Sequence, residues 1–403
     1  MNPIILFNKL EHDRFEPNEK GDIPLEHFFL AYFDCRENKK KKEEAINFEF
    51  NYERELVKLW RDVNNERYNV SALDVFISER PVKREIFAAR FRDRIVHHLV
   101  VNKLEYLLEK EFIYDTHSCR KGRGVHFAIN RAKRHILRCS KNYTKDCHIL
   151  KLDIKGYFMS IDKGILLNNL ESLINQKYLV RDKDKLIYLC RAIINNNPTK
   201  NCIRKSPREK WIGLPKSKSL FCAKNNCGLP IGNYTNQVFA NLYLTPLDHF
   251  VKHKLRVKHY VRYVDDIFIV HKDKNQLKAI ISLIKAYTEN NLNLSIHPKK
   301  IYLQHYQKGA EFLGIYIKPY RCYVSRRIKG NLWQATRDIN ILLESEEIDT
   351  NTILSKTNSY LGLLSHSNTY KLRKKFLNNL SPNMWKYFSL KKNCCSFSNS
   401  LVI

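Results

Sequence analysis

Acidic residues are scarce in this chain of 403 residues. It holds 41 Asp and Glu against 71 Lys and Arg, which gives a formal net charge of +30. A basic excess of this size favours a polyanionic partner, of which nucleic acid is the simplest. An anionic membrane surface is the weaker alternative, because the basic residues are spread along the chain instead of forming one amphipathic segment.

Long apolar runs and paired cysteine motifs are also missing. No apolar run reaches about 18 residues, so we expect no membrane span. The N-terminus MNPIILFNKLEHDRFEP has no basic leader and no small-residue cleavage site, so we expect no signal peptide. The eleven cysteines form no CxxC pair, and Cys222 with Cys227 resembles only half of a zinc site. Free thiols in a reducing compartment fit better, and we expect a cytoplasmic protein.

The residues that are present are enough for a large core. Hydrophobic residues make up 43% and aromatic residues 12% of the chain, and its length suggests two or three packed subdomains. Strands and helices alternate without a regular βαβ rhythm. This favours an α+β fold with an antiparallel sheet and helices on one face.

The local patterns place the main elements. Residues 1 to about 60 are predicted helical, with the basic run Lys39–Lys42. Two strands around a turn at Pro81 are predicted within 75–90, and a polar, basic stretch within about 170–227. Further helices are predicted at 91–112, within 228–251 after a Gly-Pro turn, at 275–290 and in the tail 325–391. Further strands are predicted at the start of 148–162 and within 291–304 and 311–324. No structure is expected from residue 391 onward.

The segment YVRYVDDIFIV, residues 260–270, places two carboxylates inside an apolar run. Burying adjacent like charges is unfavourable unless a positive partner is near. A tight hairpin would put Asp265 and Asp266 at its tip, although Asp is also an ordinary turn residue. A second apolar strand ends at Asp153 in LKLDIKGYFMSID. If the two segments are adjacent strands, three carboxylates converge, which suits a two-Mg²⁺ site.

Five motifs then occur in a familiar order: DIKGYF, GLPIGNYTNQ, YVDD, HPKK and EFLGI. In this order they resemble the palm motifs of reverse transcriptases. The upstream segments ERPVKREIFAARFRDRIVHH and CRKGRG resemble the fingers of bacterial members. The segments LPKSKSLF, GLPIGN and NSYLGLLSHSNTYKLRKKF resemble the bacterial and phage enzymes of diversity-generating retroelements, and the match spans about residues 20 to 380.

The resemblance implies a role for particular residues in metal binding and in nucleotide binding. Asp153 and Asp265 would bind two Mg²⁺ ions, which Mn²⁺ can replace, with the Ile154 carbonyl as a further ligand and Asp266 in support. The residues implied at the nucleotide are the triphosphate-binding Lys83 and Arg84, the steric gate Phe158, the acid Lys300 at pyrophosphate, and Ile231 and Gln237. An ordinary core aromatic is the alternative for Phe158, and a solvated strand-end lysine for Lys300.

One position bears on fidelity. Many members of the family carry Gln where this chain has Ile231, and an apolar residue cannot hydrogen-bond the nucleotide. In the diversity-generating branch Ile here accompanies misincorporation opposite template adenine, so Ile231 with Arg84 is expected to lower fidelity at adenines. The chain departs from that branch in reading TNQ, with Asn236 where Ser is usual.

The resemblance also implies an architecture and partners. The expected fold is a right-hand polymerase with an N-terminal helical extension (1–70), fingers (71–147), a palm (148–320) with a fingers-like insertion (about 170–227), and a thumb and tail (321–403). Phe312, Leu313 and Gly314 would form the primer grip. The expected partners are dNTPs, a structured template RNA, the RNA/cDNA duplex and a small basic accessory protein oligomer that serves mutagenic retrohoming.

Other readings stay open. An antiviral defence reverse transcriptase shares the same palm. Group II intron enzymes usually continue into DNA-binding or endonuclease domains, and the NAxxH and VTG markers expected of retron enzymes are absent. A non-catalytic RNA-binding scaffold would also be basic, but it has no reason to keep Asp153, Asp265 and Asp266 together.

Overall fold

The computed structural model describes residues 18–37, 39–79, 82–345, 349–390 and 396–399. Its centre is an antiparallel four-stranded sheet in the order β5-β6-β3-β7. The strands are β3 (His148–Leu152), β5 (His259–Tyr263), β6 (Asp266–His271) and β7 (Tyr302–His305). The predicted antiparallel sheet is therefore confirmed.

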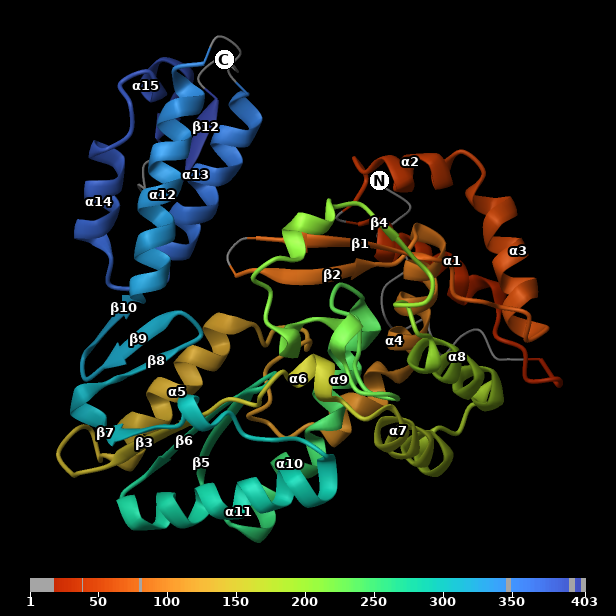
Figure 1. Ribbon diagram of the computed structural model, residues 1–403, viewed down its shortest axis with the longest axis horizontal. Coiled ribbons are helices and arrows are strands. Elements are labelled where there is room, and N and C mark those ends of the chain that lie inside the picture. The colour runs from red at the N-terminus through yellow and green to blue at the C-terminus, as the bar shows by residue number, and fades with distance from the viewer. Residues whose placement is uncertain (1–17, 38, 80–81, 346–348, 391–395, 400–403) are drawn as a thin grey trace.

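Helices cover both faces of this sheet, so the expectation of helices on one face is wrong. Successive side chains of β6 point to opposite faces of the sheet. Phe268 belongs to the core on one face, together with Ile129 and Ile136 of α5 (Val125–Cys139). Ile267 packs in the opposite core, with α9 (Tyr234–Tyr243), α10 (Thr245–His249) and α11 (Lys274–Leu292). Figure 1 shows α5 and α11 on opposite sides of the sheet. A continuously apolar strand such as IFIV is typical of a sheet buried on both faces.

The N-terminal part is largely helical, as predicted for its described residues. Its helices are α1 (Leu25–Arg36), α2 (Glu43–Glu49), α3 (Tyr52–Asn64) and α4 (Phe91–Glu111). Between α3 and α4 lies the predicted hairpin, β1 (Leu73–Ser78) with β2 (Arg84–Ala88), which a parallel strand β4 (Cys202–Arg204) extends. Pro81 lies outside the described residues.

The stretch predicted to be polar contains two packed helices. These are α7 (Lys163–Lys177) and α8 (Lys183–Asn195), whose inward faces include Leu166, Leu170, Leu186 and Ile194 at full burial. Only the part after β4 is irregular, with the short 3₁₀ turns η2 (Arg208–Trp211), η3 (Lys216–Lys218) and η4 (Leu220–Cys222). We refer to residues 207–222 as the strap. The description of 170–227 as a polar stretch therefore holds only for its second half.

Downstream of the sheet come a small sheet and a helical bundle. The small sheet is β8 (Ala310–Phe312), β9 (Ile315–Lys318) and β10 (Arg321–Val324). The bundle is α12 (Arg326–Leu343), α13 (Thr350–Ser365), α14 (Tyr370–Asn378) and α15 (Met384–Tyr387), drawn in blue in Figure 1. The helical tail is thus confirmed, but β12 (Phe397–Asn399) pairs with β11 (Phe388–Leu390), where no structure was expected.

The connections that remain are short. A π-helical turn, η5 (Phe250–Lys254), follows α10, and a short helix, α6 (Tyr157–Ser160), follows β3. Two further 3₁₀ turns flank β7, η6 (Pro298–Lys300) and η7 (Tyr306–Lys308). Of these, α6 and η6 each contain one residue predicted to be functional, Phe158 in α6 and Lys300 in η6.

Candidate active site

The two adjacent carboxylates lie at the tip of a tight hairpin, as predicted. Strands β5 and β6 pair up to Tyr263 opposite Asp266, which leaves only Val264 and Asp265 in the turn. Val264 has φ +54°, in the left-handed region that β-branched residues rarely adopt. Such strain persists only where the surroundings hold the backbone, and it is concentrated at functional sites.

Strand β3 brings the third carboxylate to the same end of the sheet. It pairs antiparallel with β6 as far as Leu152 opposite Ile267. Asp153 directly follows the end of β3, and Asp266 is the first residue of β6 at the same end of the sheet. The two predicted acidic segments are therefore on adjacent strands, and this prediction is confirmed.

The carboxylates are close enough to affect one another. Burial, together with the negative charges of Asp266 and Asp153, raises the pKa of Asp265 to about 7. Burial also raises the pKa of Asp266, against the lowering effect of the Lys151 ammonium. The site is thus short of positive charge, which is the condition under which carboxylates hold cations.

One cation already contacts the site. Lys300 Nζ lies 2.8 Å from Asp153 Oδ2, and the Asp153 carbonyl accepts a hydrogen bond from His297 N at 2.8 Å. Among the described residues, no group of three or more Asp, Glu, His or Cys side chains is close enough to hold a metal ion unaided. The oxygen donors still fit Mg²⁺, because Mg²⁺ needs one or two carboxylates and completes its shell with water and substrate phosphate.

Two predicted nucleotide-binding residues share one apolar cluster beside the carboxylates. Phe158 on α6 and Ile231 are both half-buried and pack against Phe87 and Leu220. The Ile231 carbonyl accepts a hydrogen bond from Phe87 N at 2.8 Å, which ties the GLPIGN loop to β2. The backbone of Phe158 is fixed to the same loop through Leu229 N, at 2.8 Å.

The two predicted triphosphate ligands lie at the start of β2. Arg84 begins β2 and is exposed. Lys83 Nζ donates to the Ile212 carbonyl of the strap at 2.7 Å. The strap also approaches the turn after Asp153, because a Cβ on Gly156 would lie 2.6 Å from the Ser217 oxygen. The strap therefore connects the start of β2 with the turn that follows Asp153.

The remaining residues of the GLPIGNYTNQ motif have separate environments. Asn236 is buried, and its Nδ2 donates to the Pro230 carbonyl at 3.0 Å, so this departure from the branch pattern secures the loop. Gln237 is exposed, and its Oε1 accepts a weak hydrogen bond from Cys119 Sγ at 3.7 Å.

The predicted primer grip forms the β8–β9 hairpin. Leu313 and Gly314 are its two turn residues, with φ +50° and +83°. Positive φ at both positions matches the twist of a tight hairpin. Phe312 is fully buried and packs on Phe268 of β6, with ring centroids 5.0 Å apart. Phe268 is two residues from Asp266, so this hairpin is connected to the acidic turn through one strand.

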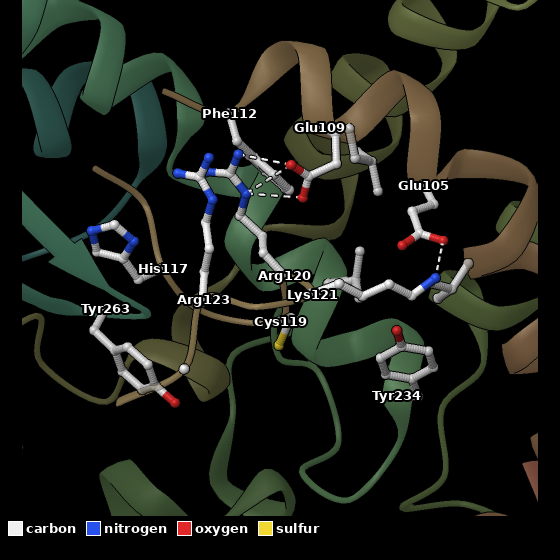
Figure 2. Close-up of a pocket in the computed structure, with 14 residues that line it drawn as sticks. Glu105, Glu109, Phe112, His117, Cys119, Arg120, Lys121, Arg123, Tyr234 and Tyr263 are labelled. Carbon is white, nitrogen blue, oxygen red and sulfur yellow. Dashed lines mark hydrogen bonds and ion pairs between the residues drawn. The ribbon is translucent and has the colours of Figure 1, made fainter. Parts of the chain in front are cut away.

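A cavity of about 280 Å³ lies between α4, the CRKGRG segment and Tyr263 at the end of β5. Figure 2 shows how ion pairs fasten this segment to α4: Arg120 contacts both oxygens of Glu109, and Lys121 contacts Glu105 at 2.5 Å. Sequence reasoning identified the segment but not this cavity.

Several buried charged residues were missed, and two of them lie close in sequence to predicted site residues. Glu85 has no exposed surface and accepts hydrogen bonds from Trp211 Nε1, Ser219 Oγ and Leu220 N of the strap. Arg262, the residue between Val261 and Tyr263, is also fully buried. Its position could have been recognised in the sequence in the same way as that of the aspartates, because a charge inside an apolar run requires a buried partner.

An antiparallel sheet with helices on both faces, an acidic hairpin at its end and a helical bundle beyond it define a polymerase of the right-hand type. Residues 82–317 match the family described as reverse transcriptase (RNA-dependent DNA polymerase). The chain belongs to this family, whose members are nucleotidyltransferases.

Comparison with individual proteins gives one relative and several structures. The chain is 26% identical over 353 residues to the putative COX1/OXI3 intron 2 protein of Saccharomyces cerevisiae, a match that covers 77% of this chain and 40% of that protein. Apo telomerase from Candida tropicalis aligns with TM-score 0.47 and 12% identity over 79% of this chain and 59% of that one. Candida albicans telomerase with a fragment of telomeric RNA aligns with TM-score 0.46 and 12% identity, over 85% and 61%. Within the described residues no helix is long and apolar enough to span a bilayer.

Proposed function

We propose that this chain copies a structured RNA template into cDNA. The observation that supports this function most directly is the pairing of β3 with β6, which sets Asp153 beside the Asp265–Asp266 hairpin. In the proposed reaction the primer 3′-oxygen attacks the α-phosphorus of a dNTP. A new P–O bond forms, the bond to the β-phosphate breaks, and pyrophosphate leaves.

Asp153 and Asp265, with the carbonyl of the buried Ile154, would hold two Mg²⁺ ions, which Mn²⁺ can replace. Asp266 supports the pair. When bound, such ions stabilise the negative charge on the attacking and leaving oxygens. Lys300 is positioned by its contact with Asp153 Oδ2 and would donate the proton that pyrophosphate takes up.

Lys83 and Arg84 would bind the triphosphate from the fingers, since cations there neutralise its charge. Lys83 would first release the Ile212 carbonyl. Phe158 would exclude a ribose 2′-hydroxyl, and Gln237 would contribute to nucleotide binding. The hairpin at Phe312, Leu313 and Gly314 would hold the primer end.

The sequence-based domain boundaries fit this function. The fingers would comprise 71–147, the palm 148–320 with an insertion at about 170–227, and the thumb the bundle within 321–403, after an N-terminal extension of 1–70. The basic residues of the thumb would grip the RNA/cDNA duplex through its phosphates.

The finer proposal is synthesis that is error-prone at template adenines, as in diversity-generating retroelements, together with a small basic accessory protein. Its support is Ile231, an apolar side chain in the same cluster as Phe158, at a position where many members of the family carry Gln. Because Ile231 cannot hydrogen-bond the incoming nucleotide, the site would discriminate less strictly between correctly and incorrectly paired nucleotides.

The experiment is Mg²⁺-dependent dNTP incorporation on a primed RNA template, followed by sequencing of the product. Asp265→Ala is the control and should abolish incorporation. Errors concentrated at template adenines, and reduced severalfold in Ile231→Gln, are the expected result. An unchanged adenine error spectrum in Ile231→Gln would refute the fidelity role and leave the polymerase function intact.

A second candidate function is reverse transcription of an intron RNA. It is favoured by the similarity to the yeast intron 2 protein. This reading predicts accurate synthesis at adenines on the same template, so the sequencing experiment separates the two.

A further inference from the structure

Arg262 lies two residues before the turn residue Val264 and is completely buried. Burying a guanidinium is unfavourable unless its charge and all its N–H groups are satisfied. The side chain must therefore be held by acceptors inside the protein, and these acceptors show what Arg262 connects.

All five N–H donors of the guanidinium have an acceptor. Nε and Nη2 donate to Oδ1 and Oδ2 of Asp248 on α10, at 2.7 and 2.5 Å. Nη1 donates to Asn241 Oδ1 at 2.8 Å, and Nη2 to the Asn241 carbonyl at 3.1 Å. Nη1 also donates to the Val264 carbonyl at 2.9 Å. The bidentate contact with Asp248 fixes the plane of the guanidinium. Its hydrogen bond to the Val264 carbonyl then fixes the backbone of the turn.

Asp248 is itself fully buried and held by further donors. Tyr260 Oη donates to its Oδ1 at 2.5 Å, and Thr116 Oγ1 to its Oδ2 at 2.7 Å. The backbone of Arg262 is fixed as well: its N donates to the Asp115 carbonyl at 3.0 Å, and its carbonyl accepts from His117 N at 3.1 Å. Hydrogen bonds thus hold both the backbone of Arg262 and the Asp248 carboxylate that its side chain contacts.

The turn needs such an anchor. Val264 has the left-handed φ of +54°, which a β-branched residue does not keep without restraint. The next residue is Asp265, whose carboxylate must face Asp153 across the sheet end. A shift of about 1 Å in a reacting group can reduce a rate about a hundredfold.

We propose that Arg262 is a positioning residue that holds the Val264 carbonyl and thereby keeps the Asp265 carboxylate beside Asp153. The inference rests on the proposed function, because it assigns a metal-binding role to Asp265. Arg262 does not touch the reacting groups and acts through the turn.

The test compares Arg262→Lys with Tyr260→Phe in the full chain. Lysine keeps the positive charge next to Asp248 but lacks the planar fork of donors. Tyr260→Phe is the matched control, since it removes a hydrogen bond to the same Asp248 without touching the turn. Asn241→Ala removes one guanidinium acceptor and serves as a milder variant if Arg262→Lys fails to fold.

Two readouts are used. Hydrogen–deuterium exchange of the peptide that contains residues 260–267 should accelerate about tenfold or more in Arg262→Lys, and less in Tyr260→Phe. In primer extension, kcat should fall roughly 10- to 100-fold and half-saturation by Mg²⁺ should rise severalfold, with KM for dNTP nearly unchanged.

The positioning role would be overturned if hydrogen exchange of residues 260–267 were as slow in Arg262→Lys as in the native chain. It would also be overturned if exchange were faster but half-saturation by Mg²⁺ were unchanged. Absence of synthesis by the native chain contradicts the proposed function instead. In that case the exchange measurement alone decides whether Arg262 holds the turn.

Discussion

Asp265 and Asp266 illustrate how far single residues can be interpreted from sequence. Two like charges in an apolar run indicated a hairpin tip with a cationic partner, and the hairpin is present. The sequence could not indicate that Val264 takes a left-handed conformation, because no glycine or asparagine marks that position. Nor could it indicate that Lys83 binds a carbonyl of the strap, since that contact joins residues 129 positions apart.

At the residue scale, Phe158→Val should relax sugar selection. A smaller side chain leaves room for a 2′-hydroxyl, so we expect the ratio of kcat/KM for rNTP over dNTP to rise about tenfold or more. Phe221→Val is the control, because Phe221 is half-buried in the same cluster. Steady-state extension with matched rNTP and dNTP measures both, and an equal change in the two variants would contradict a gate at Phe158.

At the element scale, the structure assigns the strap a clear anchor. Glu85 holds it through three hydrogen bonds to a fully buried carboxylate, at 2.7, 2.9 and 2.7 Å. Periodicity cannot reveal an irregular segment fixed by a distant side chain. Helix α7, in contrast, could have been predicted from the sequence, because Leu166, Leu170 and Ile174 follow helical spacing.

The strap should loosen in Glu85→Gln. The amide cannot accept all three donors and places its own N–H groups among them, which destabilises the folded state by about 2 kcal/mol. Urea unfolding measures this loss. Limited trypsin digestion should cleave the strap faster, at sites such as Arg208 and Lys216, and KM for dNTP should rise.

The control is Glu289→Gln on the exposed face of α11, which should leave all three measurements unchanged. Equal protease sensitivity of the two variants would show that the Glu85 carboxylate does not anchor the strap.

At the scale of the whole molecule, stability should fall in mild acid. Burial lowers the pKa of His97 to about 3 and of His117 to about 4. The unfolded chain protonates both near pH 6.5, so the unfolded state binds more protons as the pH falls below that value. The folded state then loses roughly 2 kcal/mol per histidine by pH 5.

Urea unfolding at pH 7 and pH 5 tests this prediction in the Asp265→Asn variant. In the native chain, Asp265 has a raised pKa and takes up a proton in the folded state between pH 7 and pH 5, which would stabilise the folded state and mask the effect of the histidines. A free energy of unfolding that does not decrease by pH 5 would contradict neutral buried imidazoles.

The net charge of +30 makes a prediction about template binding. If cations neutralise six or more phosphates of an RNA/DNA duplex, affinity should fall about 10³-fold between about 50 and 200 mM salt. Fluorescence anisotropy with a labelled duplex measures this slope. Asp265→Ala should bind with the same slope, and a nearly salt-independent affinity would argue against duplex binding through phosphates.

The overall architecture followed from sequence more readily than its layers did. The order of the motifs predicted the polymerase family, and the lack of a regular βαβ rhythm predicted the antiparallel sheet. The second helical face could have been predicted, because IFIV has no polar side and such continuously apolar strands are typical of a sheet covered on both faces. The pairing of β12 with β11 was missed because three-residue strands carry almost no periodic signal.

The pair formed by Arg262 and Asp248 has a consequence for sequence evolution. Losing one partner leaves the other charged and buried, which is destabilising by about 3–5 kcal/mol, whereas an uncharged pair of similar volume can be tolerated. Single substitutions at either position should therefore be eliminated by selection. Homologues that lack Arg at position 262 should also lack Asp at position 248, and this covariation should bridge the 14 positions between them.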